Sequence, residues 1–132
     1  MPDQPLRTAL EPWLAVRGAA HAVAFYIAAF GAVEIYHLED PGGGVVSRLA
    51  IEGASFWLSD ESPENGNFSP VTLGGATTRM ILSVADPDAM YARAVAAGAT
   101  AVSPVEDAYG WRSGRVLDPF WHHWEISRPL AE

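Results

Sequence analysis

The sequence contains no cysteine, which excludes disulfides, thiolate zinc sites and a cysteine nucleophile. It also contains no lysine, and its eight arginines are scattered singly along the chain. Sixteen acidic residues give a formal charge of −8. Nucleic-acid binding and polybasic membrane attachment both depend on clustered positive charge, so we expect neither a nucleic-acid partner nor a membrane partner.

Long apolar runs are absent as well. No stretch approaches the roughly 20 residues that span a bilayer. Residues 1–13 lack the basic and apolar regions of a secretory signal, so we expect a cytoplasmic protein. With 132 residues, of which 49% are hydrophobic and 18% charged, the chain has the size and composition of one globular domain, 1–132.

The first half of the chain, residues 12–60, is predicted to form a strand, a helix and three more strands. The helix is favoured by its alanine content, and Gly31 is a suitable residue to end it. Alternation of apolar and polar residues indicates the strands. The predicted ranges are a strand at 13–17, a helix at 19–30, and strands at 32–40, 45–51 and 54–59.

The second half, residues 78–129, is predicted to repeat this order after a linker at 61–77 that is rich in Pro, Gly, Asn and Ser. Asp86 and Pro87 form a strong helix start, with a carboxylate cap and proline at the first helical position. The predicted ranges are a strand at 79–84, a helix from 86 to 97, a strand at 99–105, a loop at 106–110, a strand at 112–117, and a last strand that follows the turn at 118–119 and ends on 124–126.

The two halves also resemble each other in sequence. Leu14-Ala15-Val16 and Leu82-Ser83-Val84 lie 68 residues apart (14 to 82), and the same spacing relates Trp57-Leu58-Ser59 to Glu125-Ile126-Ser127. Two unrelated units could match by coincidence, but we interpret the spacing as an internal duplication. The predicted fold is therefore α+β, with two βαβββ modules.

Polar chemistry is concentrated in residues 112–127, which we predict to form a hairpin at the mouth of a curved sheet that holds a small molecule. Neighbouring residues of a strand point to opposite faces, so His122 and His123 cannot readily bind one metal ion. His123 shares a face with Glu125, and we predict these two as an acid–base pair, with His122 pointing away beside Trp124. The simpler alternative is that one histidine is packed and the other solvated.

Several large side chains are candidates for ligand binding. Trp57, Trp111, Trp121 and Trp124 are predicted to form apolar walls for a planar or apolar ligand, and the alternative is core packing or a dimer contact. Tyr109 and Arg112 flank the hairpin. Arg112 could hold an anionic or carbonyl-bearing ligand, or form a surface ion pair.

Several short motifs recur in a characteristic order along residues 12–128. They are Leu14-x-Val16, Phe25-Tyr26 with Phe30-Gly31-Ala32, Leu58–Glu61, Ala96–Ala99, Ser113-Gly114-Arg115, and Asp118-Pro119-Phe120 before Trp124-Glu125-Ile126. Together they resemble the vicinal oxygen chelate superfamily, which includes glyoxalase I, bleomycin-resistance proteins and extradiol dioxygenases. The resemblance is greatest to the PhnB-like branch, although Trp121 stands where that branch usually has glycine.

The resemblance implies curled mixed sheets around a cavity and, often, a homodimer. It places Glu11, Trp57, Arg79 and Glu125 at the four metal-ligand positions of metal-dependent members. Tryptophan offers no lone pair and arginine repels a cation, so we favour no metal cofactor. Arg79 is predicted to replace the cation and to pair with Glu125, and this pairing could extend to Glu11. If a divalent metal binds, Glu11 and Glu125 are its expected ligands.

Three functions remain open from the sequence. The first is a small-molecule binding protein that does not use the family metal site, with Trp57, Arg79, Tyr109, Trp111, Arg112 and Trp124 in contact with the ligand. The second is a lyase, isomerase or dioxygenase that uses Glu125 and His123. The third is a regulatory role with a vestigial cavity.

Overall fold

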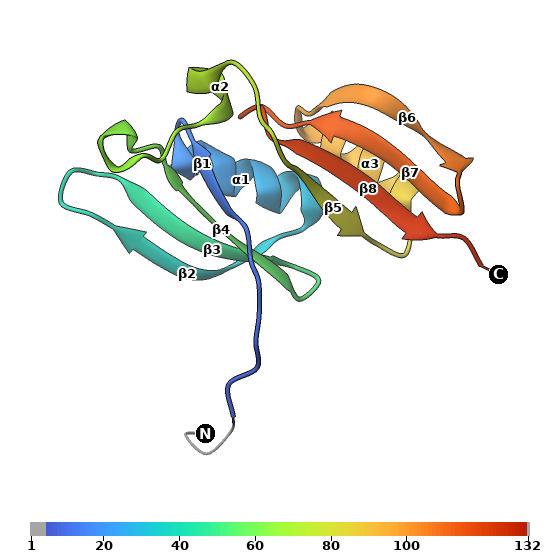
Figure 1. Ribbon diagram of the computed structural model, residues 1–132, viewed down its shortest axis with the longest axis horizontal. Coiled ribbons are helices and arrows are strands. Elements are labelled where there is room, and N and C mark those ends of the chain that lie inside the picture. Colours follow the sequence, from blue (N-terminus) through green and yellow to red (C-terminus); the bar gives the residue numbers. More distant parts are fainter. Residues whose placement is uncertain (1–4, 132) are drawn as a thin grey trace.

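The computed structural model describes residues 5–131 and contains two four-stranded sheets side by side, each with a helix against one face (Figure 1). The first module consists of β1 (Trp13–Val16), α1 (Ala19–Phe30), β2 (Val33–Glu39), β3 (Val45–Ile51) and β4 (Ala54–Asp60). The second consists of β5 (Arg79–Ser83), α3 (Pro87–Ala97), β6 (Thr100–Ala108), β7 (Trp111–Leu117) and β8 (His123–Pro129).

The two modules have the same topology. The strand orders are β1-β4-β3-β2 and β5-β8-β7-β6, and the first pair of each sheet is parallel while the other pairs are antiparallel. Leu14 pairs with Leu58, and Leu82 pairs with Ile126, at the residues that the sequence repeat aligns. The predicted α+β fold of two βαβββ modules is confirmed, and both sheets remain open rather than closing into a barrel.

The hydrophobic core is shared between the modules through a cluster of aromatic rings. Trp124 of β8 lies against Phe30 of α1, with ring centroids 4.7 Å apart, and against Phe56 of β4 at 5.4 Å. Tyr26 of α1 contacts both Trp124 and Phe56 at 5.4 Å. Elements from both halves of the chain therefore pack in one continuous core, supported by the contact between α1 and α3.

A buried carboxylate ties the turn between β7 and β8 to this core. Asp118, only 2% exposed, accepts hydrogen bonds from the Tyr26 hydroxyl and from Trp124 Nε1. Its other oxygen accepts from the backbone N–H groups of Phe120 (2.8 Å) and His122 (3.0 Å). Burial, and then the adjacent Asp118, raise the pKa of Tyr26 well above its usual value. Asp118 thus fixes both the turn and α1.

One predicted boundary is wrong, and the linker contains short helices. The region 106–110, predicted to be a loop, is largely strand, because β6 continues to Ala108 as an edge strand whose polar residues face solvent. Bulges on either side of Ser103 shift its register, which simple alternation does not predict. The linker at 61–77 is also partly helical, with a 3-10 turn at Pro63–Asn65 and helix α2 at Pro70–Leu73.

The turn after Asp118 keeps a glycine-like backbone although it carries Trp121. Trp121 has a φ of 71°, and its N–H donates to the Asp118 carbonyl at 3.1 Å. The left-handed conformation costs a residue with a Cβ about 1–2 kcal/mol. We therefore expect the variant Trp121→Gly to be about 1 kcal/mol more stable than Trp121→Ala in urea denaturation. Both variants lack the indole ring, so the difference between them reports the backbone strain alone. Equal stability of the two variants would contradict the strain at this turn.

Within residues 5–131, no helix is long and apolar enough to cross a membrane.

Candidate functional site

The open face of the first sheet carries an aromatic cluster. Strand alternation directs Leu14 and Leu58 toward the core and their neighbours Trp13 and Trp57 toward the open side. The two indoles stack with centroids 5.5 Å apart and planes 8° apart, and Tyr36 of β2 meets Trp57 at 5.7 Å. Trp13 is 51% exposed and Tyr36 45% exposed. We call Trp13, Tyr36 and Trp57 the aromatic face.

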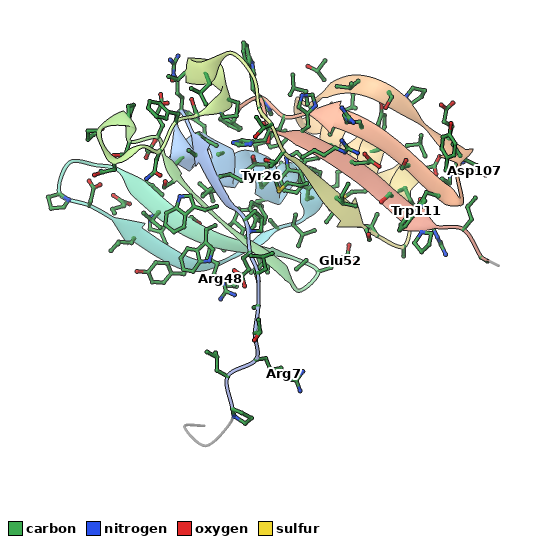
Figure 2. All side chains as sticks on the ribbon, viewed as in Figure 1. Arg7, Tyr26, Arg48, Glu52, Asp107 and Trp111 are labelled. Atoms are coloured by element: carbon green, nitrogen blue, oxygen red, sulfur yellow. The ribbon has the colours of Figure 1, made fainter. Side chains whose placement is uncertain are left out.

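An arginine is fixed above this surface. The Arg48 guanidinium lies 5.5 Å from the centre of the Trp57 ring, at cation–π distance. Its Nε and Nη2 donate to the two oxygens of Glu11 at 2.9 and 2.6 Å, and Glu11 also accepts from Ser55. The hydrogen bonds from Arg48 hold the pKa of Glu11 below its usual range. Figure 2 shows Arg48 on this part of the molecule.

The open face of the second sheet carries the predicted pair of Arg79 and Glu125. Arg79 Nε donates to Glu125 Oε1 at 2.8 Å, so these two residues form the contact that the sequence predicted. Glu11 does not join them, and that part of the prediction is wrong, because Glu11 is held by Arg48 of β3. Arg115 lies opposite Glu125 in the register of β7 and β8.

These residues do not fit a family-type divalent metal site. Trp57 provides no lone pair and stacks on Trp13, and Arg79 is itself a cation. Each of the remaining carboxylates, Glu11 and Glu125, is bound to an arginine. Across residues 5–131, no three His, Asp or Glu side chains gather in a way that could hold a metal ion.

The histidines occupy different environments. His123 Nδ1 is buried without a hydrogen-bond partner in the described part of the chain, as is Ser127 Oγ, and no hydrogen bond joins His123 to Glu125. The acid–base role of His123 and Glu125 stays a prediction. His122 precedes β8 and, like Trp124, is buried and turned toward the first module, where its Nε2 lies 2.9 Å from the Ala15 carbonyl oxygen.

Trp124 lies mainly in the core rather than on a ligand-binding surface. It is 3% exposed and packs among the rings of α1 and β4. Its edge reaches a cavity of about 260 Å³ between β4 and β5, which Arg79 also lines. Substitution of Trp124 would therefore act first on folding.

The predicted ligand contacts at Tyr109, Trp111 and Arg112 lie elsewhere, at the connection between β6 and β7. Figure 2 shows Trp111 at this end of the second sheet. Arg112 donates to both oxygens of Asp88 at 2.7 Å and to Asp107 at 2.9 Å, and these carboxylates raise its pKa. Arg112 therefore forms a surface ion pair, which was the alternative to ligand binding that the sequence left open. Tyr109 is fully exposed at a turn, and the structure does not bring these three residues to the aromatic face.

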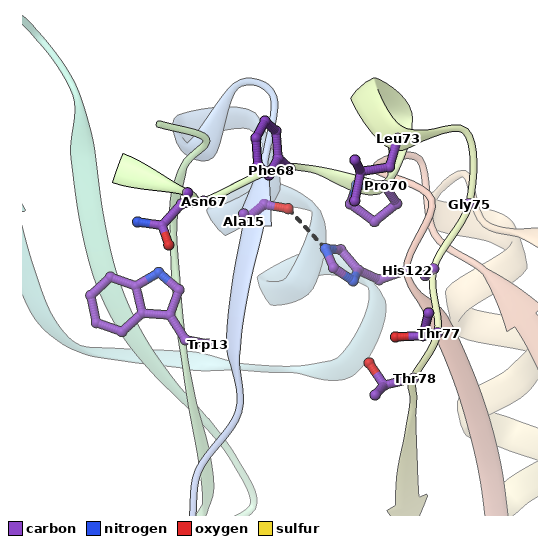
Figure 3. Close-up of a pocket in the computed structure, with 12 residues that line it drawn as sticks. Trp13, Ala15, Asn67, Phe68, Pro70, Leu73, Gly75, Thr77, Thr78 and His122 are labelled. Carbon is purple, nitrogen blue, oxygen red and sulfur yellow. Dashed lines mark hydrogen bonds between the residues drawn. The ribbon is translucent and has the colours of Figure 1, made fainter. Parts of the chain in front are cut away.

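Sequence reasoning missed a cavity of about 530 Å³ beneath the linker, between β1 and residues 66–78 (Figure 3). His122 and Trp13 line it, together with Phe68, Pro70 and Leu73 from around α2. One local signal was available: a serine followed by proline is a helix-start pattern, and the Ser69 side chain caps α2 by accepting from the Thr72 N–H.

Glu61 holds this linker in place. It accepts hydrogen bonds from the Ser69 backbone N–H (3.0 Å), the Thr72 hydroxyl (2.7 Å) and Arg17 Nε (3.0 Å). These contacts, led by the Ser69 N–H, lower the pKa of Glu61 from 4.5 to about 2. The linker is thus fastened to the end of β1 by one carboxylate.

The linker should therefore loosen in acid. Because the folded pKa of Glu61 is depressed, its stabilising contribution is present above pH 4.5 and is lost as the pH falls to about 2. We expect the protection factor of the Ser69 amide in hydrogen exchange to fall through this window. The variant Glu61→Gln should show no such pH dependence, and an unchanged dependence in that variant would contradict the assignment.

Comparison with known proteins gives consistent results. The sequence profile of the Glyoxalase/Bleomycin resistance protein/Dioxygenase superfamily matches residues 7–126. An uncharacterized protein of Mycobacterium bovis is 41% identical over 129 residues, covering 94% of this chain and 85% of the relative. The crystal structure of an Arabidopsis thaliana gene product is 31% identical with a TM-score of 0.72, covering 93% of this chain and all of the other.

Two more distant structures share the fold. TnmS3, an antibiotic binding protein from Streptomyces, has a TM-score of 0.72 at 19% identity, with 96% of this chain and 99% of the other covered. The fosfomycin resistance protein FosX from Listeria monocytogenes, in complex with Mn(II) and sulfate, has a TM-score of 0.67 at 19% identity, with 94% and 93% covered. Proteins of this fold thus include one that binds an antibiotic and one that binds a divalent metal.

Proposed function

Because the chain belongs to the glyoxalase/bleomycin resistance protein/dioxygenase superfamily, we propose that it is a small-molecule binding protein that does not use the family metal site. Its ligand is a planar aromatic molecule that stacks on the aromatic face. The observation that carries this proposal is the stack of exposed Trp13 on partly exposed Trp57, bordered by exposed Tyr36.

The physical basis is the exposed apolar area of these rings. Indole and phenol rings gain about 0.5–1.5 kcal/mol per aromatic contact beyond area burial, and their rigid side chains lose little entropy on binding. Arg48 is held by Glu11, so a ligand meets a preorganised surface rather than a mobile cation. The antibiotic-binding activity of TnmS3 supports this class of function.

In this proposal, two arginines replace the metal ion as the positive charges that balance the carboxylates. Arg48 and Arg79 neutralise Glu11 and Glu125, the two carboxylates that remain at the family positions. A metal would have to displace both ion pairs, and Trp57 would offer it no ligand. The charge balance of the site is therefore complete without a metal ion.

The same proposal includes a homodimer that covers the open faces. The edge strand β2 leaves Val33, Ile35 and Leu38 about half exposed, beside the aromatic face. A second copy would shield these side chains and enclose the ligand. Light scattering on the purified protein should give twice the chain mass of 14.1 kDa, and a monomer would contradict this part of the proposal.

A planar dye tests the binding site. Because the protein has a net charge of −8, a cationic probe is favoured, and we choose proflavine, a planar diaminoacridine. Calorimetric titration in the presence of a chelator should show one saturable site per chain. The variant Trp111→Ala, which removes a half-exposed tryptophan remote from the aromatic face, should bind equally well. Absence of saturable binding, or binding lost in Trp111→Ala, would contradict the proposal.

A further inference from the structure

The cavity beneath the linker has the features of a second binding site. Its volume of about 530 Å³ lies within the range of about 300–1,000 Å³ usual for small-molecule sites. Phe68, Pro70 and Leu73 form the wall on the linker side, and Trp13 and Ala15 form the wall on β1 (Figure 3). His122 lies between the two walls.

The lining contains no charged side chain, although the chain carries sixteen acids and eight arginines. Of its twelve residues, only Asn67, Thr77, Thr78 and His122 have polar side chains. An ion in this cavity would lose hydration without gaining a counter-charge, which is unfavourable. The lining therefore selects an uncharged molecule that is mainly apolar.

His122 gives the cavity a fixed hydrogen-bond acceptor. The ring is 8% exposed, and its Nε2 lies 2.9 Å from the Ala15 carbonyl oxygen. A carbonyl can only accept, so Nε2 carries the hydrogen and, in the neutral ring, Nδ1 carries the lone pair. The His122 backbone N–H is held in turn by Asp118, at 3.0 Å.

Nδ1 of His122 is free to meet a ligand. It makes no hydrogen bond to any residue between 5 and 131 and is not one of the buried atoms that lack a partner. Figure 3 shows the ring directed into the space between the linker and β1. This contrasts with His123, whose Nδ1 is buried away from solvent.

We infer that the cavity beneath the linker binds a neutral, largely apolar molecule whose hydroxyl or amide N–H donates to His122 Nδ1. This site is separate from the aromatic face, because Trp57, Tyr36 and Arg48 do not line the cavity. Only Trp13 contributes to both sites. Ala15 fixes the ring, His122 supplies the acceptor, and the linker residues supply the apolar contact.

Three small probes test the inference by NMR titration of the full chain. Phenol has both ring and donor, anisole lacks the donor, and benzoate is charged. We choose about pH 8, where an ordinary imidazole is neutral and phenol keeps its proton. Phenol should shift the His122 and Phe68 signals saturably and bind about 3–10-fold more tightly than anisole, the value of one net hydrogen bond. Benzoate should not bind.

Variants separate the roles of the residues. His122→Gln keeps a donor for the Ala15 carbonyl, and its only acceptor, Oε1, does not occupy the position of Nδ1, so phenol affinity should fall toward that of anisole while anisole affinity is unchanged. Phe68→Ala, at a half-exposed position, should weaken both probes equally and preserve their ratio. Tyr36→Ala, which removes a ring of the aromatic face that pairs with Trp57 and does not line the cavity, should leave phenol binding unchanged and so separates the two sites.

Equal affinity of phenol and anisole for the wild-type protein, or phenol binding insensitive to His122→Gln, would overturn the inference. So would phenol shifts confined to Tyr36 and Trp57, or no saturable shift at the solubility limit. If His122→Gln loses its native spectrum, the ratio of phenol to anisole affinity in wild type and Phe68→Ala decides the question.

Discussion

The variant Asp118→Ala is expected to lose about 3–5 kcal/mol of unfolding free energy. Removing the carboxylate leaves the Tyr26 hydroxyl, Trp124 Nε1 and two backbone N–H groups buried without an acceptor. It also releases the turn that carries His122 toward the first module. Urea denaturation with comparison of midpoints and slopes measures the loss.

Two matched variants separate the contributions. Tyr26→Phe removes one donor and keeps the packing, so it should cost about 1.5–3 kcal/mol, the range for a hydrogen bond to a charged group. Asp118→Asn keeps the shape but turns one acceptor into a donor that faces other donors, and its cost should lie between those of Tyr26→Phe and Asp118→Ala. A loss of less than about 1 kcal/mol in Asp118→Ala would show that water replaces the carboxylate.

The variant Trp57→Ala is expected to weaken proflavine binding about 30-fold or more. Aromatic residues at the centre of an interface commonly contribute about 2 kcal/mol or more to affinity. Trp57 lies between Trp13, Tyr36 and Arg48, so its removal takes away the stacking partner of all three. Calorimetry under the conditions used for the wild-type protein gives the ratio of dissociation constants.

The stability of this variant provides the control. Trp57 is on the open side of its sheet, so we expect Trp57→Ala to remain folded, with the Asp118 network intact. Trp111→Ala removes the same side chain from the remote end of β7 and should bind proflavine normally. Equal affinity in Trp57→Ala and Trp111→Ala would place the dye elsewhere on the molecule.

The repeated fold could be predicted because its signals are local. The helix start at Asp86 is confirmed, since its side chain accepts from the Ala89 N–H at 3.1 Å. Spacing of the repeat placed Leu14 and Leu82 at equivalent positions in their sheets. The sequence could not predict the pairing of Glu11 with Arg48, because Glu11 precedes β1 and Arg48 is in β3, so the contact depends on how both strands align with β4 between them. Periodicity does not determine this register.

Closeness in sequence was misleading at Trp111 and Arg112. A strand rises about 3.3 Å per residue, so the two ends of β7 lie roughly 20 Å apart. Residues at the start of this strand therefore cannot share a site with His123, which pairs with Leu117 at its other end. The cavity beneath the linker was missed for a related reason: Glu61 and Arg17 hold it together across 44 residues of sequence.

Metal content most directly tests the claim that this protein binds its ligand without a metal ion. We would dialyse the purified protein against Mn(II), Zn(II) and Ni(II), remove free metal, and measure bound metal and proflavine affinity on the same samples. Our account predicts far less than one metal ion per chain and the same affinity with or without chelator, because Arg48 and Arg79 already neutralise Glu11 and Glu125. One retained metal ion per chain, with proflavine binding that a chelator abolishes, would contradict it.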